Sequence, residues 1–262
     1  DGLAMSISGN GLFNVSKKTG AVTSAGSSFE AEQFYTRNGE FYEDKDGYLE
    51  NTSGYYLDGY MVNSKTGALD TSSLTQINVS NVTFRPTQTT TLTSTGTLVT
   101  SASPVTMSAA VHDGGYDQSD PTADTGNVTL TWTNTGTDTW TVAASGDSSV
   151  TTGDSTYTGP YTVKFNTDGT LASVTDSSSP AQYVTSTLSG AAATIPISVK
   201  YKNGTTQNVN IAIGTIGSSS GMSTSTTSST TPTVVSDSVT SGTYQSASIE
   251  SDGSVMATFD NG

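Results

Sequence analysis

Hydrophobic and polar residues alternate in short runs along most of the chain, and turn residues separate these runs. The alternation is clearest in VTLTWTNTGTDTWTVAA (128–144), PYTVKFNTDGTLASVT (160–175) and ATIPISVKYKNGTTQNVNIAI (193–213). A period of two places every other side chain on one face of a strand, and Gly or Asn at the bend is typical of a hairpin. Trp132 and Trp140 flank one such hairpin and are expected to form a core pair. No segment has a convincing amphipathic helix pattern, so the sequence predicts an all-β sandwich or flattened barrel.

The first part of the chain, residues 1–84, is rich in aromatic residues and predicts a compact β unit. A strand with an adjacent Gly-Asn-Gly turn is expected at residues 7–15. Asn-Gly is the dipeptide favoured in type I′ hairpin turns, so a hairpin is expected around Asn38-Gly39. Further turns are predicted at Asp46-Gly47, Ser53-Gly54 and Asp58-Gly59.

The composition changes at Arg85-Pro86, where the Thr-rich run TQTTTLTSTGTLVTSASP begins. Residues 215–241 consist almost entirely of Ser, Thr and Gly, which predicts a linker or an extended crossing segment. The early pattern returns in residues 242–262, with another Asp-Gly hairpin. We therefore expect two β domains, one inserted into the other: a discontinuous domain of residues 1–84 plus 232–262, and an inserted domain of residues 85–231.

The composition narrows the possible functions. The chain has 23 acidic and 9 basic residues, a net charge of −14, and no cysteine. Such a surface repels nucleic acid and anionic membranes, and the lack of cysteine excludes disulfides and cysteine metal sites. No apolar run approaches the ~20 residues of a membrane helix, and no signal peptide is visible. The chain starts without Met, and we expect it to be a fragment with trimmed ends.

The segment FYEDKDGYLENTSGYYLDG (41–59) invites a search for calcium or acid chemistry. Counted from Asp44, an EF-hand loop would need Gly at its sixth position and Glu at its twelfth, but Gly47 is fourth and Tyr55 twelfth. Glu43, Asp44 and Asp46 could in principle serve a glycosidase. Acidic residues in hairpin turns are usually solvated, and Asp-Gly recurs at 168–169 and 252–253, so turn chemistry is the simpler interpretation.

Other catalytic patterns are missing. His112 is the only histidine; no G-x-S-x-G nucleophile elbow accompanies it, and VHDGG reads as a strand ending in a turn. A single histidine cannot build an imidazole zinc site, and no phosphate-binding loop is present. The sequence therefore predicts no enzyme activity, no catalytic or metal-binding residue and no cofactor.

Three segments together resemble the bacterial flagellar hook and rod protein family: GNGLFNV (9–15), FYTRNGEFYEDKDGYLENTSGYYLDGYMV (34–62) and GTYQSASIESDGSVMATFDNG (242–262). The shared pattern is a Tyr-Thr-Arg-x-Gly hairpin, an Asp-x-x-Gly-x-Leu turn and a Gly-Tyr-x-Leu-x-Gly strand. The middle hairpins are similar to the inserted domain of hook proteins. Each motif is weak alone, but the combination is specific.

The resemblance implies a structural subunit of the flagellar hook, which self-assembles into a curved tube that acts as a universal joint and transmits motor torque to the filament. Its partners would be copies of itself, the hook cap, the distal rod and the hook–filament junction proteins. The location would be extracellular, reached through flagellar export without a cleaved signal peptide. The helical termini of the family are missing from this chain, so it is expected to be monomeric in dilute solution.

A universal joint needs stiff domains connected by hinges. The two predicted crossings between the domains contain Arg85 and Pro86 on one side and Thr231 and Pro232 on the other, and these four residues are our hinge candidates. A secreted adhesin or carbohydrate-binding module is the main alternative, because the tyrosines of residues 41–60 could stack on sugars. An enzyme is a distant third.

Overall fold

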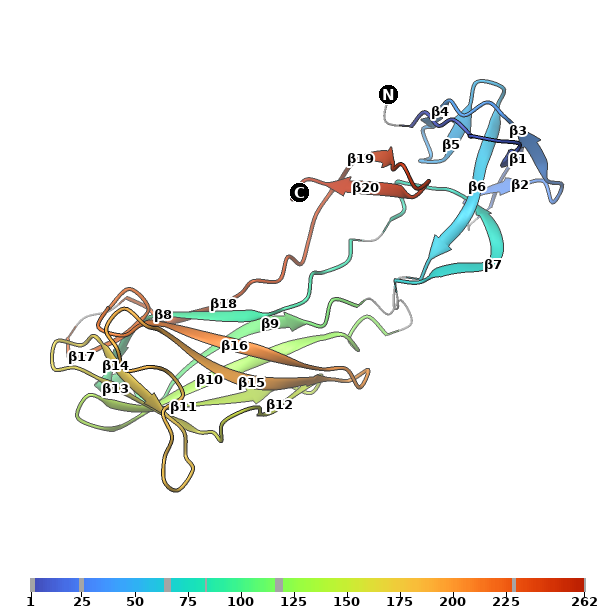
Figure 1. Ribbon diagram of the computed structural model, residues 1–262. Helices are drawn as coiled ribbons and strands as arrows, with labels where there is room; N and C mark the ends of the chain where they lie inside the picture. Colours follow the sequence, from blue (N-terminus) through green and yellow to red (C-terminus); the bar gives the residue numbers. More distant parts are fainter. Residues whose placement is uncertain are drawn as a thin grey trace. The chain divides into compact units, whose positions relative to one another are not determined.

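The structure is a computed structural model that describes residues 3–23, 26–63, 67–82, 84–115, 120–227 and 230–261. The chain divides into two compact units (Figure 1): unit 1 comprises Asp1–Arg85 and Thr240–Gly262, and unit 2 comprises Pro86–Val239. Regular structure in the described residues consists of strands and one short 3-10 turn, Thr100–Ala102. The all-β prediction is confirmed.

Unit 1 is built on one seven-stranded sheet and a separate hairpin. The sheet has the order β2-β1-β6-β5-β4, with β3 paired to β1 and β7 paired to β6. Its strands are β1 (Phe13–Thr23), β2 (Gly26–Phe29), β3 (Phe34–Thr36), β4 (Phe41–Glu43), β5 (Leu49–Asn51), β6 (Tyr55–Val62) and β7 (Leu69–Gln76). The hairpin is formed by β19 (Tyr244–Ile249) and β20 (Val255–Phe259), from the end of the chain.

A small aromatic and aliphatic core holds unit 1 together. Its buried members are Val15, Phe41, Leu49, Leu57 and Val79. The C-terminal hairpin packs against this cluster through Tyr244, Ala247 and Val255. Segments from both ends of the chain therefore share one core.

Five hairpin turns have the same design, in which the fourth residue is Gly. Its N–H donates to the carbonyl oxygen of the first residue, and its φ is positive: Gly47 (+86°), Gly54 (+80°), Gly169 (+84°), Gly204 (+90°) and Gly253 (+87°). A type I turn followed by a left-handed residue is a common three-residue hairpin connection, and Gly adopts that conformation without strain. The turns predicted at Asp46-Gly47, Ser53-Gly54 and the later Asp-Gly pairs are confirmed.

Three local predictions for unit 1 are wrong. Asp58-Gly59 is not a turn, because both residues lie inside β6 beside a register shift. Asn38-Gly39 does not close a hairpin, because β3 pairs with β1 whereas β4 pairs with β5, and neither residue has positive φ. A Cβ on Gly39 would lie 1.9 Å from the carbonyl oxygen of Met5, so this glycine permits close backbone contact. Residues 7–12 form no strand, and β1 begins at Phe13.

Unit 2 is a sandwich of two sheets. The five-stranded sheet has the order β14-β13-β11-β10-β9, and the other has the order β12-β15-β16-β8-β17 with β18 also paired to β8. The strands are β8 (Thr91–Val99), β9 (Val105–His112), β10 (Thr125–Gly136), β11 (Thr139–Gly146), β12 (Val150–Asp154), β13 (Tyr161–Phe165), β14 (Leu171–Thr175), β15 (Ala192–Tyr201), β16 (Thr206–Thr215), β17 (Met222–Ser225) and β18 (Thr233–Ser236). The predicted hairpins β10–β11, β13–β14 and β15–β16 are confirmed.

The core of unit 2 lies between its two sheets. Trp132 and Trp140 are both fully buried in it, on adjacent strands, as the hairpin pattern predicted. The facing sheet contributes residues such as Ile195, Val209 and Ile211. One continuous cluster thus joins both sheets, which is the arrangement of a sandwich.

The Thr-rich and Ser-rich runs, expected to be a loosely constrained boundary and a linker, are instead part of this core. Residues of the first run form β8, and Leu92, Ser94, Gly96 and Leu98 are buried at every second position. In the second run, β17 pairs in parallel with β8, and Met222 is fully buried. The linker interpretation of residues 215–241 is therefore wrong. The expected boundary at residue 232 also differs, since β18 pairs with β8 and unit 2 continues to Val239.

Candidate functional site

The acidic turn of residues 44–47 in unit 1 is paired with a lysine from β1. Lys18 Nζ lies 3.2 Å from Asp44 Oδ2 and 3.0 Å from Asp46 Oδ2. The same ammonium lies 5.5 Å and 5.2 Å from the ring centroids of Tyr48 and Tyr56. Burial acts to lower the pKa of Lys18, but the hydrogen bonds to Asp46 and Asp44 outweigh it and raise the pKa. The carboxylates thus hold a lysine in place against two aromatic rings.

The backbone of this turn donates to the second oxygen of Asp44, and Lys45 Nζ lies 2.9 Å from the second oxygen of Asp46. Asp44 Oδ1 accepts the N–H groups of Asp46 and Tyr48, each at 2.9 Å. Asn51 repeats the pattern one hairpin later, where its Oδ1 accepts the N–H groups of Ser53 and Tyr55 at 3.0 Å. Among the described residues, no group of three or more His, Cys, Asp or Glu side chains is arranged to hold a metal ion. Both the spacing of the acidic residues along the chain and their hydrogen bonds indicate a structural turn.

A buried carboxylate that the sequence analysis missed lies in β6. Asp58 is buried and accepts hydrogen bonds from Ser16 Oγ (2.8 and 2.6 Å) and from Gln76 Nε2 (3.2 Å). Burial raises the pKa of Asp58, opposed by the hydrogen bonds from Ser16 and Gln76. The carboxylate joins β1, β6 and β7, so it fixes three strands at one point. Because Asp58 is followed by Gly59, the sequence pattern predicted a turn at this position.

The Arg of the Tyr-Thr-Arg-x-Gly motif has a structural role. The Arg37 guanidinium donates to the carbonyl oxygens of Ile7, Gly9 and Gly11, at 3.2, 2.9 and 3.0 Å. A planar group with several donors suits a set of converging carbonyls, and a lysine would not reproduce it. Arg37 therefore holds residues 7–11 in place, whereas the chain just before them pairs with the β4 side through an Ala4–Glu40 bridge.

His112 is the last residue of β9, and the contacts given for it among the described residues are structural. Its backbone pairs with Thr125, and its N–H donates to Thr89 Oγ1 at 2.9 Å. Burial lowers the pKa of the imidazole, opposed by the charges of Asp124 and Asp113. The half-buried ring is thus favoured in its neutral form at neutral pH.

The two chain segments at the entrance to unit 2 are tied together by hydrogen bonds. We call residues 87–91 and 236–239 the neck. Thr87 N–H donates to the Val239 carbonyl at 3.0 Å, and Val239 N–H donates to Thr87 Oγ1 at 2.8 Å. The Asp237 carboxylate accepts the N–H of Thr90 at 2.9 Å and also its hydroxyl, while Asp237 N–H donates to the Thr91 carbonyl at 3.1 Å. The two segments therefore enter unit 2 as a bonded pair.

The neck locates the hinge candidates along the chain. Arg85 is the last residue of the first segment of unit 1 and Pro86 the first of unit 2, so both lie at a crossing. Thr231 and Pro232 lie inside unit 2, and a Cβ on Gly96 of β8 would approach Pro232 Cα to 2.5 Å. The second crossing is between Val239 and Thr240, eight residues beyond Thr231 along the chain. Whether these crossings bend remains a prediction.

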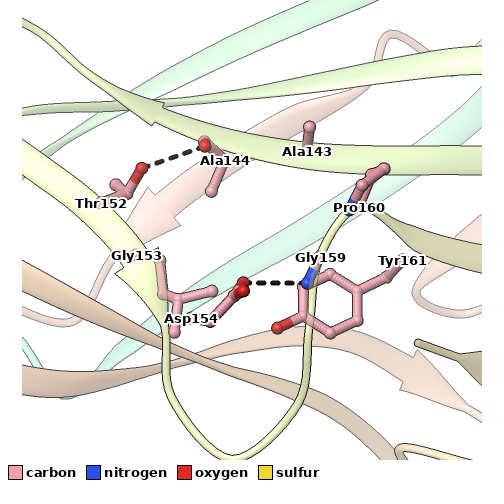
Figure 2. A pocket seen from close by; sticks show the side chains of 9 residues that line it. Ala143, Ala144, Thr152, Gly153, Asp154, Gly159, Pro160 and Tyr161 are labelled. Atoms are coloured by element: carbon pink, nitrogen blue, oxygen red, sulfur yellow. Dashed lines mark hydrogen bonds between the residues drawn. The ribbon is translucent and has the colours of Figure 1, made fainter. Parts of the chain in front are cut away.

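Unit 2 also has a shallow hollow of about 290 Å³ between β11 and the segment that joins β12 to β13 (Figure 2). It is lined mostly by small or apolar residues: Ala143, Ala144, Thr152, Gly153, Asp154, Gly159, Pro160, Tyr161 and Ile197. Asp154 Oδ1 accepts the Gly159 N–H at 2.8 Å, and Thr152 Oγ1 donates to the Ala144 carbonyl at 3.0 Å. Burial, with the charges of Asp154 and Asp176, raises the pKa of Tyr161 to about 12. The polar groups are engaged and no nucleophile–base pair is present among these residues.

Comparison with known proteins identifies the first part of the chain. Residues 6–100 match the family model of the flagellar hook protein FlgE/F/G D1 domain. This part of the chain is similar to a flagellar hook FlgE/F/G D1 domain. The match covers the N-terminal segment of unit 1 and runs into β8 of unit 2. Arg37, the Lys18 cluster and Asp58 all lie within the matched residues of this D1 domain.

The similarity of the chain to a solved structure is weak. The chain is similar to the crystal structure of the Helicobacter pylori flagellar hook protein FlgE2, with 12% sequence identity and a TM-score of 0.32, over 100% of this chain and 86% of that one. No curated protein matches the chain significantly.

The D1-domain match bears on the functional class. Hook proteins of the D1 family are structural and not enzymatic, and they are parts of the flagellum, outside the cell. The match of residues 6–100 supports a hook- or rod-type structural subunit. In the described part of the chain, no helix has the length and apolar character to span a membrane.

Proposed function

We propose that this subunit polymerises with copies of itself into the curved tube of the flagellar hook and bends at two chain crossings as the tube rotates. The observation that carries the proposal is the D1-domain match of residues 6–100 on a chain made of two compact β units. A joint that bends while rotating needs stiff bodies and compliant connections, and each unit has its own hydrophobic core.

The double crossing suits torque transmission. The crossings are Arg85-Pro86 and Val239-Thr240, and the hydrogen-bonded neck holds their unit 2 ends together. A single connecting segment of chain can rotate about its own axis. Two connecting segments held side by side bend in one direction more easily than they twist. The second hinge candidate, Thr231-Pro232, therefore moves to Val239-Thr240 in this proposal.

The remaining partners follow from the family. We propose that the end subunits of the tube meet the distal rod, the hook cap and the hook–filament junction proteins. We also propose that the protein leaves the cell through the flagellar export channel without a cleaved signal peptide. The absence of cysteine suits this route, because nothing needs to be oxidised on arrival.

A sugar-binding module is the alternative. Tyr42 and Tyr60 are 47% and 44% exposed, but the packing of Tyr48 argues against a stacking role for that ring. Tyr48 forms edge contacts with Phe29 and Tyr56, at centroid distances of 5.1 and 6.2 Å, and its ring also faces Lys18. Rings used in this way do not offer a flat exposed face for stacking. A glycan array separates the two proposals, because specific glycan binding would favour the adhesin.

The hinge is testable by measuring distances between spin labels. The chain has no cysteine, so Ser53→Cys in unit 1 and Thr137→Cys in unit 2 would give one label on each unit. We expect a broad distance distribution for this pair. The pair Thr137→Cys and Thr205→Cys, both in unit 2, serves as the rigid control and should give a narrow one. Equally narrow distributions for both pairs would refute the hinge.

A further inference from the structure

Three Asn-Gly pairs lie in the described part of the chain, and their surroundings differ. They are Asn10-Gly11, Asn38-Gly39 and Asn203-Gly204. A fourth pair, Asn261-Gly262, ends at a residue outside the described part. Asparagine is a chemically labile residue, and a following glycine has no Cβ to obstruct attack on the asparagine side chain by the next backbone nitrogen. Each pair is therefore a possible site of deamidation, and the fold decides which pair can react.

The reaction needs no catalyst. A base removes the proton of the Gly N–H, the Gly nitrogen forms a bond to the Asn Cγ, and the Cγ–Nδ2 bond breaks as the amide nitrogen leaves as ammonia. Water then opens the resulting succinimide ring to aspartate or isoaspartate. Two structural conditions follow, because the Asn Cγ must turn to within about 3–3.5 Å of the Gly nitrogen and the Gly N–H must be free to lose its proton.

Asn203-Gly204 meets neither condition, although both residues are exposed. Asn203 Nδ2 donates to Asp113 Oδ2 at 2.7 Å, and Asn203 Oδ1 accepts the Thr205 N–H at 2.8 Å. The Gly204 N–H donates to the Tyr201 carbonyl at 2.9 Å. The negative charge of Asp113 beside the pair also disfavours a deprotonated nitrogen. Exposure alone therefore does not make an Asn-Gly pair reactive.

Asn38-Gly39 is held by its side-chain amide. Asn38 Oδ1 accepts the Glu40 N–H at 3.0 Å, and Asn38 Nδ2 donates to Thr52 Oγ1 at 2.9 Å. Gly39 is buried, and its carbonyl accepts the Met5 N–H at 2.8 Å. The amide of Asn38 cannot turn toward the Gly39 nitrogen without breaking both of its hydrogen bonds.

Asn10-Gly11 meets both conditions. Both residues are exposed and lie before β1. Among the described residues, neither the Asn10 side-chain amide nor the Gly11 N–H has a hydrogen-bond partner. Arg37 holds the carbonyls of Gly9 and Gly11, so the main chain on either side of Asn10 is anchored while the Asn10 side chain can turn. The positive charge of Arg37 near the pair also favours a deprotonated nitrogen.

We propose that Asn10 is a site of spontaneous deamidation in the folded protein, and that Asn38 and Asn203 are protected by their hydrogen bonds. Each event replaces a neutral amide with a carboxylate. Where isoaspartate forms, the main chain also gains one methylene between the Gly9 and Gly11 carbonyls. The modification therefore changes both the charge and the backbone of the segment that Arg37 holds.

The test follows each pair by peptide mapping and mass spectrometry while the 262-residue chain is kept in mildly alkaline buffer. One sample is folded and a second is unfolded in guanidinium chloride. In the folded sample we expect Asn38 to react at least about tenfold, and Asn203 roughly a hundredfold, more slowly than Asn10, because two and three hydrogen bonds respectively must break first. In the unfolded sample the three rates should lie within a few-fold of one another, because these hydrogen bonds are gone.

Asn10→Gln is the matched variant, because a glutamine at this exposed position closes the corresponding larger ring far more slowly. The first acidic species that anion-exchange chromatography resolves in ageing wild-type protein should be absent from this variant. Its appearance at the wild-type rate would overturn the proposal. Asn38 or Asn203 reacting as fast as Asn10 in the folded chain would overturn it too, and so would an Asn10 that folding slows as much as it slows the other two. None of these results affects the proposed hook function, which is tested separately by the location of the protein.

Discussion

Replacing Thr224 with valine should destabilise unit 2 strongly, although Thr224 lies in a run that looks like a Ser/Thr linker. The side chain is 7% exposed and lies on β17. Its Oγ1 accepts the Trp140 indole N–H at 3.0 Å and donates to the Leu98 carbonyl at 3.0 Å. Valine keeps the shape of threonine and removes both hydrogen bonds.

The expected cost follows from the burial of the partners. Trp140 and Leu98 are both 0% exposed, so water cannot replace the lost bonds. A buried donor left without an acceptor costs about 1–3 kcal/mol, and a lost hydrogen bond to a carbonyl about 0.5–1.5 kcal/mol. We expect a loss of about 2–4 kcal/mol in the free energy of unfolding of unit 2. For a domain of this size, that corresponds to a decrease in Tm of roughly 5–15 °C.

Urea unfolding followed by tryptophan fluorescence measures this loss. Both tryptophans of the chain, Trp132 and Trp140, lie in unit 2, so the signal reports on that unit alone. Thr226→Val is the matched control, since Thr226 is exposed two residues further along. It should change the free energy of unfolding by less than about 0.5 kcal/mol. If Thr224→Val and Thr226→Val had equal effects, β17 would not be part of the core, and the reasoning would fail.

Three further predictions concern side chains with defined partners. Arg37→Ala should lower the free energy of unfolding of unit 1 by about 1–2 kcal/mol and speed amide hydrogen exchange in the segment before β1. Arg37→Lys should not restore the stability, and unchanged exchange would contradict the role of Arg37. Asp58→Asn should be more stable than the wild type at pH 7, because burial penalises the charged carboxylate of Asp58. Since the pKa of Asp58 is raised, the wild type gains stability as the pH falls through that pKa, and the stability advantage of the variant should shrink in acid. An advantage that grew in acid would contradict a raised pKa. The pKa of Asp120 is shifted in the opposite direction, because hydrogen bonds from Lys202 and Thr122 lower it to about 2. The stabilisation by Asp120 is therefore present above about pH 4 and should disappear as the pH falls toward 2. Acid titration of the unfolding midpoint should show this loss in the wild type and not in Asp120→Asn.

The parts of the fold that the sequence predicted are those in which chemistry acts locally. Alternating residues around Trp132 and Trp140 predicted the β10–β11 hairpin, because large apolar side chains on one face of a strand have to be buried. Asp46-Gly47 predicted its turn, because Gly accepts positive φ and Asp bonds the adjacent backbone. Such signals depend on a few neighbouring residues.

The parts that the sequence did not predict depend on distant partners. Ser94 and Gly96 look like loop residues, yet β8 is buried because β16, β17 and β18 all pair with it. Asp58 resembles a turn residue, and only its hydrogen bonds to Ser16 and Gln76 show that it belongs inside the sheet.

The central claim is that this chain is a subunit of the flagellar hook, and its location on the cell tests that claim most directly. Antibodies raised against unit 2 and coupled to gold should be imaged by electron microscopy on intact flagellated cells of the source bacterium. The account predicts label confined to the short curved segment between the cell surface and the filament. Label spread over the cell surface, as an adhesin would give, or label along the filament would contradict it.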